Sequence, residues 1–438
     1  MTPNEQMLAY TEAVRSGLYA RQSGLVGKYD NVRRLWEDEI IRFNLRPHLH
    51  RVIDRCRAGL RRVRILDLGC GGADGYELLM GIRDRDADLK QLEVDLLTPE
   101  VLGLYHGVDL NPDLLAQARA VHGHRPKVRF SQVDFTHEAA LSEDGEPYDV
   151  YFSSYGTCSH HNEDATFVTL LANIARRTRD YALIHCDWLG RYSYEWQTLW
   201  THDPNAYRNM DYVVSYIYEK DERERRREQL QHLMLRVMSR PEIDALVKEA
   251  SEQAGVPIRP LCVYDRSIFT GRHMDTGEYN PHARPIRQAV NSLHEVNRRT
   301  DLGSLLVDYA PREGFGHINS ALERLQMCWN DLVAYTAGLL EAYDEEARGF
   351  RTALPAPPAA APPILVAMRD RMRRVVEGTG WYGMGLPREN IIEPQLGYAL
   401  RAIMSALQPA QGCGHGLVGI YEVDKRPGAA AGATTAAA

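Results

Sequence analysis

The segment between residues 63 and 79 constrains the fold of this chain more than any other stretch. It opens with a mostly apolar run at 65–68, and such a run is buried on both faces when it forms a strand between helices. Gly69, Gly71 and Gly72 follow, and their lack of a Cβ lets the backbone approach a ligand and aim its amides at it. We therefore predict a strand, a ligand-binding turn and then an amphipathic helix.

Asp67 distinguishes between the ligands that such a turn can hold. Glycine-rich turns between a strand and a helix bind dinucleotides as well as S-adenosylmethionine (SAM). A carboxylate two residues before the first glycine would repel a pyrophosphate, whereas it suits the cationic amino group of SAM. The spacing Asp67-x-Gly69-x-Gly71 closely resembles motif I of the class I SAM-dependent methyltransferases, with Ala73 where that family often has a third glycine. A nicotinamide site and a plain strand-turn-helix connection are the alternatives.

Strands and helices alternate from residue 61 to residue 280, and this alternation predicts the fold. After the first strand, we expect strands at 101–109, 128–135, 148–154, 181–187, 212–218, 233–238 and 258–264. Such alternation gives a doubly wound α/β sheet whose ligand lies beyond the carboxyl ends of the strands. The ending from 233 to 264 resembles the sixth and seventh strands of the class I fold, in which the last strand runs antiparallel. The resemblance therefore implies a seven-stranded Rossmann-like methyltransferase sheet in which 233–238 and 258–264 are the sixth and seventh strands.

The length of the chain indicates more than one structural unit. At 438 residues it is too long for one ordinary domain. We expect an N-terminal helical lid at 1–60, a SAM-binding catalytic domain at 61–280 with a surface insertion at 82–100, a mostly helical accessory region at 281–427 with a proline-alanine linker near 354–363, and a disordered tail at 428–438. The accessory region either roofs the acceptor site or forms a homodimer interface, and both alternatives stay open.

Composition narrows the class of protein. Apolar residues make up 44% and charged residues 25%, as in globular proteins, and no stretch approaches the roughly 20 apolar residues of a membrane helix. The N-terminus lacks the basic start and apolar core of a signal peptide. Seven cysteines without CxxC pairs indicate reduced thiols and no zinc framework. We therefore expect a cytoplasmic protein with no metal and no membrane partner.

The charge pattern argues against nucleic acid as a partner. The formal net charge is −7, and nucleic-acid binding normally needs an exposed basic surface. The one dense basic run, at 223–227, is interleaved with acidic residues, which indicates a solvated helix start rather than a phosphate-binding site.

Acidic residues at the tips of successive strands complete the predicted SAM site. A carboxylate at Asp109 suits a ribose, because two adjacent hydroxyls can both donate to it. In the family that this chain resembles, an acid at the position of Asp134 typically accepts from the adenine amino group, and Phe135 would pack against the ring. A lid of the kind found in that family would add Tyr29. The expected cofactor-binding residues are Tyr29, Asp67, Gly69, Gly71, Asp109, Leu110, Asp134, Phe135 and Ser153.

Residues after the fourth and fifth strands are expected to bind and activate the methyl acceptor. His160 and His161 are the first candidates for a general base, because imidazole titrates near neutral pH, and Asp187 is the second. The acceptor pocket is expected to contain Tyr155, Arg191, Tyr192, Tyr194 and Trp196, with structural packing as the alternative role. Arg266, Arg272, His273 and Asp275 are candidates for binding an anionic acceptor, whereas Cys413 and His415 are too few for a zinc site.

These features predict an enzyme that transfers a methyl group from SAM. Methyltransferases that act on amino groups of nucleic acids or protein glutamine resemble one another in an Asp/Asn-Pro-Pro-Tyr motif, where this chain has Ser153-Ser-Tyr-Gly156. A small-molecule acceptor, methylated at oxygen, nitrogen or carbon and belonging to secondary metabolism, is therefore our expectation. The alternatives are an RNA or protein methyltransferase and a SAM-binding regulatory protein without activity.

Overall fold

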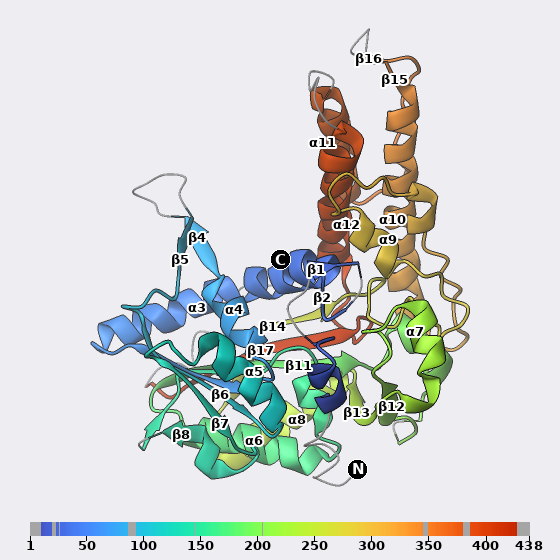
Figure 1. Ribbon diagram of the computed structural model, residues 1–438. Helices are drawn as coiled ribbons and strands as arrows, with labels where there is room; N and C mark the ends of the chain where they lie inside the picture. The colour runs from blue at the N-terminus through green and yellow to red at the C-terminus, as the bar shows by residue number, and fades with distance from the viewer. Residues whose placement is uncertain are drawn as a thin grey trace.

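The computed structural model describes residues 10–19, 23–25, 27–85, 93–143, 145–203, 205–344, 349–379 and 386–426. Their centre is a nine-stranded, mostly parallel sheet with helices on both faces (Figure 1). Its strands are β3 (Val63–Leu68), β6 (Leu102–Asp109), β7 (Val128–Gln132), β10 (Val150–Phe152), β11 (Tyr181–Gly190), β12 (Asn209–Val213), β13 (His232–Met238), β14 (Ile258–Arg266) and β17 (Gly416–Asp424). The predicted doubly wound α/β sheet is confirmed.

The order of the strands creates a switch point in the middle of the sheet. β3 pairs in parallel with β6 on one side and with β10 on the other. β6 continues to β7, and β10 continues to β11. The chain thus winds outward from β3 to β7 and then in the opposite direction from β10. Ligands of doubly wound sheets bind outside the carboxyl ends of the strands at such a point.

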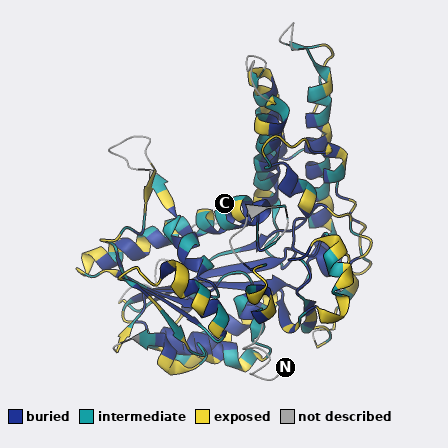
Figure 2. Ribbon diagram, viewed as in Figure 1, coloured by how far each residue is buried: buried dark blue, intermediate teal, exposed yellow. Residues whose placement is uncertain are grey.

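β3 has the two buried faces that its apolar sequence predicted. Ile65 packs into the core on one face of the sheet, and Leu66 and Leu68 pack into the core on the other face. None of the three is more than 3% exposed. Figure 2 shows that the strands at the centre of the sheet are buried along most of their length. A strand buried on both faces needs a layer of helices on each side.

Two sets of helices provide these layers. α3 (Asp38–Ala58), α4 (Asp74–Met80) and α5 (Pro112–His122) share one core, and α6 (Asp164–Arg177) and α8 (Arg240–Ala254) share the other. Local sequence sets where two of them begin. The Asn111 side chain accepts from two backbone N–H groups at the start of α5, and Ser239 forms a capping box with Glu242 at the start of α8.

The antiparallel strand inside the sheet is not the one that the sequence predicted. We expected the segment 258–264 to be this strand and the sheet to end near residue 280. Instead β14 is an edge strand, and β17 runs antiparallel between β11 and β14. β17 is buried at residues 416–423, and a position between two strands satisfies the backbone groups on both of its edges. The accessory helices are therefore inserted between two neighbouring strands of one sheet.

Three long helices form a projection that rises from the sheet (Figure 1). α10 (Gly316–Ala342), α11 (Pro363–Thr379) and α12 (Glu393–Leu407) pack on one another through buried side chains such as Leu325 and Met372. α11 begins at the end of the predicted proline-alanine segment. Within the described residues, none of the helices has both the length and the apolar character needed to cross a bilayer.

Shorter elements complete the chain. Before α3 lie α2 (Thr11–Arg15), β1 (Ser23–Gly24), β2 (Tyr29–Asp30) and the π-helical η1 (Arg33–Glu37). The predicted insertion at 82–100 contains a hairpin of β4 (Arg83–Arg85) and β5 (Glu93–Asp95) that stands off the sheet (Figure 1). The others are η2 (Glu138–Leu141), β8 (Ser142–Glu143), β9 (Glu146–Pro147), η3 (Thr157–His160), η4 (Tyr194–Leu199), α7 (Lys220–Arg225), η5 (Arg227–Gln229), α9 (Arg287–Ser292), η6 (Leu302–Leu305), β15 (Tyr343–Asp344), β16 (Gly349–Phe350) and η7 (Arg388–Ile392).

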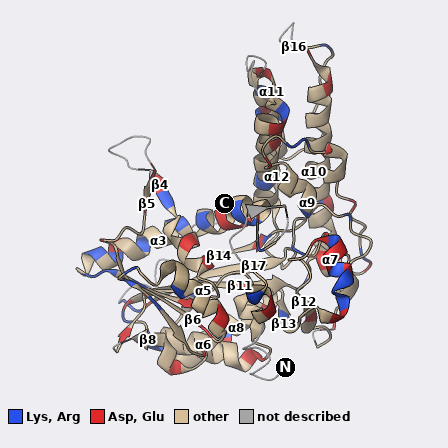
Figure 3. Cartoon of the chain, viewed as in Figure 1, with Lys and Arg blue, Asp and Glu red and all other residues tan. Residues whose placement is uncertain are grey.

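The dense basic run lies on a solvated helix. Figure 3 shows acidic and basic residues interleaved along α7, and none of the residues of α7 is buried. The run at 223–227 therefore carries mixed charge on an exposed face. The predicted disordered tail at 428–438 lies outside the described residues.

Gly190 lies at the end of β11, where the turn before β17 crosses it. A Cβ here would overlap the backbone carbonyl oxygens of Gly412 and Gly414, which cannot move aside as the end of a side chain can. We expect Gly190→Ala to lower the free energy of unfolding by about 1–3 kcal/mol, measured by urea denaturation. The control is Gly338→Ala in α10, where the new methyl meets nothing within 4 Å and should stabilise by about 0.5–1 kcal/mol. Equal stability of the two variants would contradict this packing.

Candidate functional site

A cavity of about 310 Å³ opens at the carboxyl ends of β3, β6, β10 and β11. This is where the doubly wound topology predicts a ligand, and the volume is in the range of small-molecule sites. The residues predicted from the sequence that line it are Gly69, Gly71, Asp109, Leu110, Asp134, Phe135, Tyr155, His160, His161, Arg266 and Arg272, whereas His273 and Asp275 are not among the cavity residues. Residues from the lid, from the sheet and from the turn before β17 also line the cavity.

The glycine-rich turn forms one wall of the cavity. Gly69 has a φ of 66° and Gly71 a φ of 51°, which is the left-handed region that favours glycine. A Cβ on Gly69 would also overlap the Thr157 side chain. Ala73, where the resembled family often has a third glycine, keeps a left-handed φ of 70°. The turn thus holds the conformation that a third glycine would favour.

Asp109 lies at the tip of β6 with its carboxylate held in place by the backbone. Oδ2 accepts from the N–H of Gly71 at 2.9 Å, and Oδ1 accepts from the N–H of Asn111 at 2.8 Å. Each carboxylate oxygen has two lone pairs, so each can accept a further hydrogen bond. Burial raises the pKa of Asp109, and these backbone hydrogen bonds oppose the rise. The arrangement fits a ligand that offers two adjacent hydroxyl donors.

Asp134 and Phe135 form the next part of the wall. Asp134 Oδ1 accepts from the backbone N–H of Thr136 at 2.9 Å and from its hydroxyl at 2.7 Å. The ring of His161 meets the ring of Phe135 edge to face, with the centroids 4.9 Å apart. An acidic acceptor therefore stands beside an aromatic surface, as an adenine base requires.

Asp67 is buried behind the turn and does not line the cavity. It is 1% exposed, and its Oδ2 accepts a hydrogen bond from the hydroxyl of Tyr105. A Cβ at Gly75 would overlap the Asp67 carboxylate, so α4 can approach only because residue 75 is glycine. Burial raises the pKa of Asp67 to about 8. The carboxyl group of Asp67 therefore packs behind the glycine-rich turn, between Tyr105 and Gly75 of α4.

The lid closes over the turn through ion pairs with Asp74. Lys28 Nζ lies 2.9 Å from Asp74 Oδ2, and Arg33 Nη2 lies 3.3 Å from the same oxygen. Although burial opposes it, these cations hold the pKa of Asp74 well below its usual range. The hydroxyl of Tyr29 donates to Asp74, so the predicted cofactor contact at Tyr29 is not among the cavity residues, whereas Tyr19 of the lid is.

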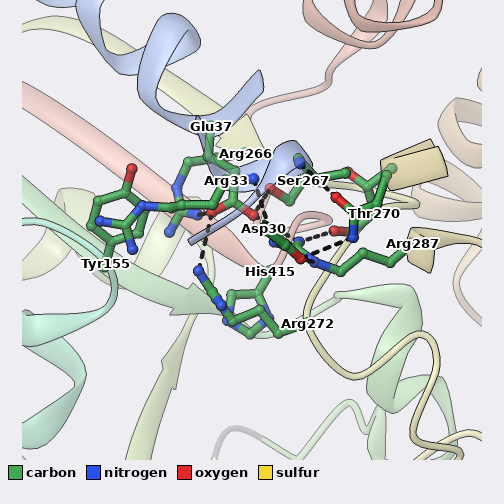
Figure 4. A network of polar contacts seen from close by, with 12 residues as sticks. Asp30, Arg33, Glu37, Tyr155, Arg266, Ser267, Thr270, Arg272, Arg287 and His415 are labelled. Atoms are coloured by element: carbon green, nitrogen blue, oxygen red, sulfur yellow. Dashed lines mark hydrogen bonds and ion pairs between the residues drawn. The ribbon is translucent and has the colours of Figure 1, made fainter. Parts of the chain in front are cut away.

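A buried ion network lies beside the cavity (Figure 4). Arg266, at the end of β14, is 3.0 Å from Asp187 and 3.2 Å from Glu37 of the lid, and all three side chains are at most 1% exposed. Arg287 of α9 lies 2.9 Å from Glu37 and 2.6 Å from Asp30. The network thus joins the lid, the sheet and the accessory region.

Asp187 belongs to this network and does not reach the cavity. Besides pairing with Arg266, its Oδ2 accepts from the backbone N–H of Tyr155 at 2.8 Å. We predicted Asp187 at the tip of the fifth strand, but β11 continues to Gly190. Asp187 therefore lies inside the strand as an anchor for Arg266.

His160 and His161 both line the cavity. Burial lowers the pKa of each to about 4, so both imidazoles are neutral at neutral pH. His160 packs near the ring of Tyr10, with centroids 6.2 Å apart. His161 lies against Phe135, at the end of the cavity that fits an adenine.

Several residues predicted to line the acceptor pocket are not among the cavity residues. Arg191 pairs with Glu242 at the start of α8, and the Tyr194 hydroxyl donates to the carbonyl of Asp308 at 2.7 Å. The Trp196 indole N–H donates to the carbonyl of Gly190 at 2.9 Å. The other residues predicted to contact a ligand but absent from the cavity wall are Tyr192, packed near Trp200 and Phe315, and Ser153, whose hydroxyl lies 3.2 Å from the Cys158 sulfur.

Five residues form the far end of the cavity, and the sequence analysis assigned only one of them, Arg272, to an acceptor site. These are Tyr10, Tyr212, Tyr216, Arg272 and His415. Arg272 had been singled out for an anionic acceptor and His415 only as half of an inadequate zinc pair. No local motif marks the other three, because Tyr10 comes from the lid, Tyr212 from β12 and Tyr216 from the segment between β12 and α7.

Comparisons with known proteins found similarity to solved structures only. No family model matches the sequence, and no curated protein matches it. A SAM-dependent methyltransferase from Clostridium acetobutylicum is similar at 13% identity, covering 54% of this chain and 86% of its own, with a TM-score of 0.34. CcbJ methyltransferase from Streptomyces caelestis is similar at 15% identity, covering 46% and 74%, with a TM-score of 0.29.

A third solved structure is CalS10, an amino pentose methyltransferase from Micromonospora echinaspora. It is 15% identical, covers 50% of this chain and 85% of its own, and has a TM-score of 0.28. All of these TM-scores are low, so the assignment of the fold rests on the strand order and the antiparallel β17 of the chain itself. The chain has the fold of the class I SAM-dependent methyltransferases.

The buried carboxyl group of Asp67 should make the stability of the protein depend on pH. Its pKa is about 8 in the folded protein and about 3.9 in an unfolded chain, so the folded state binds more protons between these values. The free energy of unfolding contributed by this group therefore falls as the pH rises from about 4 to about 8. We expect Asp67→Asn to gain stability relative to the unmodified protein over this range, measured by urea denaturation without SAM.

Asp244→Asn on the exposed face of α8 is the matched control and should follow the unmodified protein. Parallel pH dependences for Asp67→Asn and the unmodified protein would show that the Asp67 carboxyl is not held protonated by burial.

Proposed function

We propose that this chain is a SAM-dependent methyltransferase that acts on a small molecule. The observation that carries the proposal is one continuous cavity. It contains the glycine turn, Asp109 and the pair Asp134 and Phe135, and it extends to Tyr212 and His415. Methyl transfer requires the donor and the acceptor to meet in line in one space, which a shared cavity provides.

The residues along the wall fit the parts of SAM in order. Phe135 would pack on the adenine while Asp134 accepts from its amino group. Asp109 would accept from both ribose hydroxyls, because each of its oxygens has a lone pair left. The amides of the turn at Gly69 and Gly71 would lie against the amino-acid end. When bound, SAM supplies a methyl group on a sulfonium, and the chain has to orient the acceptor toward it.

The small volume of the cavity and the lid over its glycine-rich turn support a small acceptor rather than a macromolecule. The lid covers the turn through the Lys28 and Arg33 pairs with Asp74, and the buried Arg266 side chain also lines the cavity. A cavity of about 310 Å³ suits a compact ligand. An RNA or protein acceptor would require an open groove that leads to the same point.

Titration calorimetry with SAM and with its demethylated product, S-adenosylhomocysteine (SAH), tests the proposal. Both should bind, and Asp109→Ala should weaken SAM at least about tenfold, because hydrogen bonds to a charged group are each worth about 1.5–3 kcal/mol. Asp211→Ala, on the exposed pair with His232, is the control and should bind SAM normally.

A methyl-labelled SAM assay with small-molecule extracts then separates the enzyme from a regulatory protein. Transfer of label into the low-molecular-weight fraction supports the proposal. Binding of SAM with no transfer to any fraction would favour a non-catalytic SAM-binding protein, and unchanged SAM affinity in Asp109→Ala would overturn the assignment of the cofactor site.

A further inference from the structure

Four tyrosine side chains in the cavity wall form an aromatic box. Tyr10 and Tyr19 come from the lid, and Tyr212 and Tyr216 come from the segment that follows β11. The Tyr10 and Tyr19 rings have centroids 5.2 Å apart, and the Tyr212 and Tyr216 rings have centroids 6.3 Å apart. Flat apolar surface with hydroxyl groups at its edge suits a planar, partly polar molecule.

Cations already occupy the faces of two of these rings. Lys28 Nζ lies 4.0 Å from the centroid of the Tyr19 ring, and the Arg272 guanidinium lies 5.0 Å from the centroid of the Tyr216 ring. A box with its ring faces open would favour a cationic ligand. Here the two resident cations would repel such a ligand, so the box favours a neutral or anionic acceptor.

Arg272 has donors to spare. Its one hydrogen bond in the described part of the chain runs from Nη2 to the carbonyl oxygen of Lys28 at 3.2 Å. Its nearest carboxylate oxygen, on Glu37, is 3.8 Å away and is closer to Arg266. Because a guanidinium has five N–H donors, Arg272 can stabilise negative charge that develops on a molecule in the box.

His415 lines the same end of the cavity and is held by a buried carboxylate. Its Nδ1 lies 2.7 Å from Glu195 Oε2, and Glu195 is 1% exposed. An ionised carboxylate only accepts hydrogen bonds, so Nδ1 carries the proton and Nε2 carries the lone pair. Within the described residues no group hydrogen-bonds Nε2. The side chain therefore has the form of a general base oriented by a carboxylate.

The charges around His415 keep it able to accept a proton. Burial lowers the pKa of His415, so the imidazole is neutral near neutral pH, and Glu195 opposes this by stabilising the imidazolium. Arg266 and His273 also face it and act against protonation. The rings of Trp196 and Tyr212 pack beside it.

A rigid turn presents His415 at the carboxyl end of β11. Asp265 Oδ1 accepts from the backbone N–H groups of Gly412 at 2.8 Å and Cys413 at 2.9 Å. The backbone N–H of His415 donates to the carbonyl of Ser267, and its carbonyl accepts from the N–H of Gly190, both at 3.2 Å. The position of the imidazole is therefore set by the main chain on both sides.

We propose that His415, positioned by Glu195, is the general base of the reaction, and that the acceptor is a small aromatic hydroxyl compound held among the four tyrosines. The inference rests on the proposed function. In the step, the acceptor O–H bond breaks and its proton bonds to Nε2 of His415. The acceptor oxygen bonds to the methyl carbon, and the carbon–sulfur bond breaks with its electron pair left on sulfur. The positive charge passes from the sulfonium to the imidazolium beside Glu195.

The test uses 4-nitrophenol as a probe, because only its phenolate form absorbs visible light. The full chain is first saturated with SAH, and binding of SAH is recorded by calorimetry. Addition of the probe should then raise the ratio of phenolate to phenol at least about tenfold over the ratio in buffer at the same pH, which corresponds to a shift of about one pKa unit in the probe. The pH profile of this ratio is recorded for each variant.

Three variants identify the base. His415→Gln should return the ratio to the value in buffer. Glu195→Gln should give an intermediate ratio with a pH profile displaced upward, because the imidazolium loses its counter-charge. His232→Gln is the control, since His232 also pairs with a carboxylate, that of Asp211 at 2.9 Å, but on the exposed surface, and it should match the unmodified protein.

A second measurement does not depend on the variants folding. The measurement is made at a pH well below the pKa of free 4-nitrophenol, so that the unbound probe is almost entirely phenol. If the probe then gives its proton to His415, formation of the bound phenolate releases no proton to the buffer. If Arg272 alone selects the phenolate, about one proton is released for each probe bound. Calorimetry of probe binding to the unmodified, SAH-loaded protein in two buffers of different ionisation enthalpy measures this number.

Each outcome decides. No proton release together with loss of the phenolate signal in His415→Gln supports the proposal. Three outcomes would overturn the proposal: release of one proton, an unchanged phenolate signal in a folded His415→Gln variant, or no binding of the probe. In each of these cases, binding of SAH would still support the proposed function. Failure of SAH to bind overturns the proposed function itself.

Discussion

The ion pairs of Arg266 connect the lid to the central sheet. This one guanidinium, 1% exposed, meets Asp187 from β11 and Glu37 from the lid. Glu37 in turn meets Arg287 of α9, although burial opposes its ionisation, and the surrounding arginines hold its pKa well below its usual range. Removal of one member of such a network leaves an uncompensated buried charge, which typically costs about 3–5 kcal/mol. The lid, the sheet and the accessory region are therefore held in one arrangement.

This arrangement explains why the far end of the cavity is assembled from distant parts of the chain. Tyr10 comes from the lid, Tyr212 from β12 next to β13, Arg272 from the loop after β14, and His415 from the turn before β17. Since β17 returns to pair with β11, the accessory region between residues 281 and 415 does not separate His415 from the cofactor end of the cavity. The projection of α10, α11 and α12 instead rises away from the sheet (Figure 1).

Local sequence was sufficient for the features that depend on neighbouring residues. The apolar run before Gly69 gives a strand buried on both faces, and Asn111 caps α5 as its side chain predicts. Asp109 and Asp134 both reach the cavity because each follows or ends a strand whose carboxyl end faces it. Asp67, by contrast, lies behind the turn, where it accepts a hydrogen bond from the Tyr105 hydroxyl. Tyr105 is on the neighbouring strand, so no local sequence pattern could predict this contact.

The features that sequence did not predict depend on partners far along the chain. The apolar pattern of β17 indicates a strand but not that it lies between β11 and β14. The sequence analysis placed Asp187 at the tip of its strand because the end of β11 could not be located from local sequence. β11 continues three residues further, to Gly190, so Asp187 lies inside the strand, where it pairs with Arg266. His415 gave no signal as a base, because its partner Glu195 is 220 positions away.

A crystal structure of the protein with SAH bound would test the central claim most directly. The account predicts the adenine against Phe135, the ribose hydroxyls on Asp109, and the sulfur directed toward the end of the cavity that holds Tyr212 and His415. SAH bound outside this cavity, or bound with its sulfur facing away from that end, would contradict it.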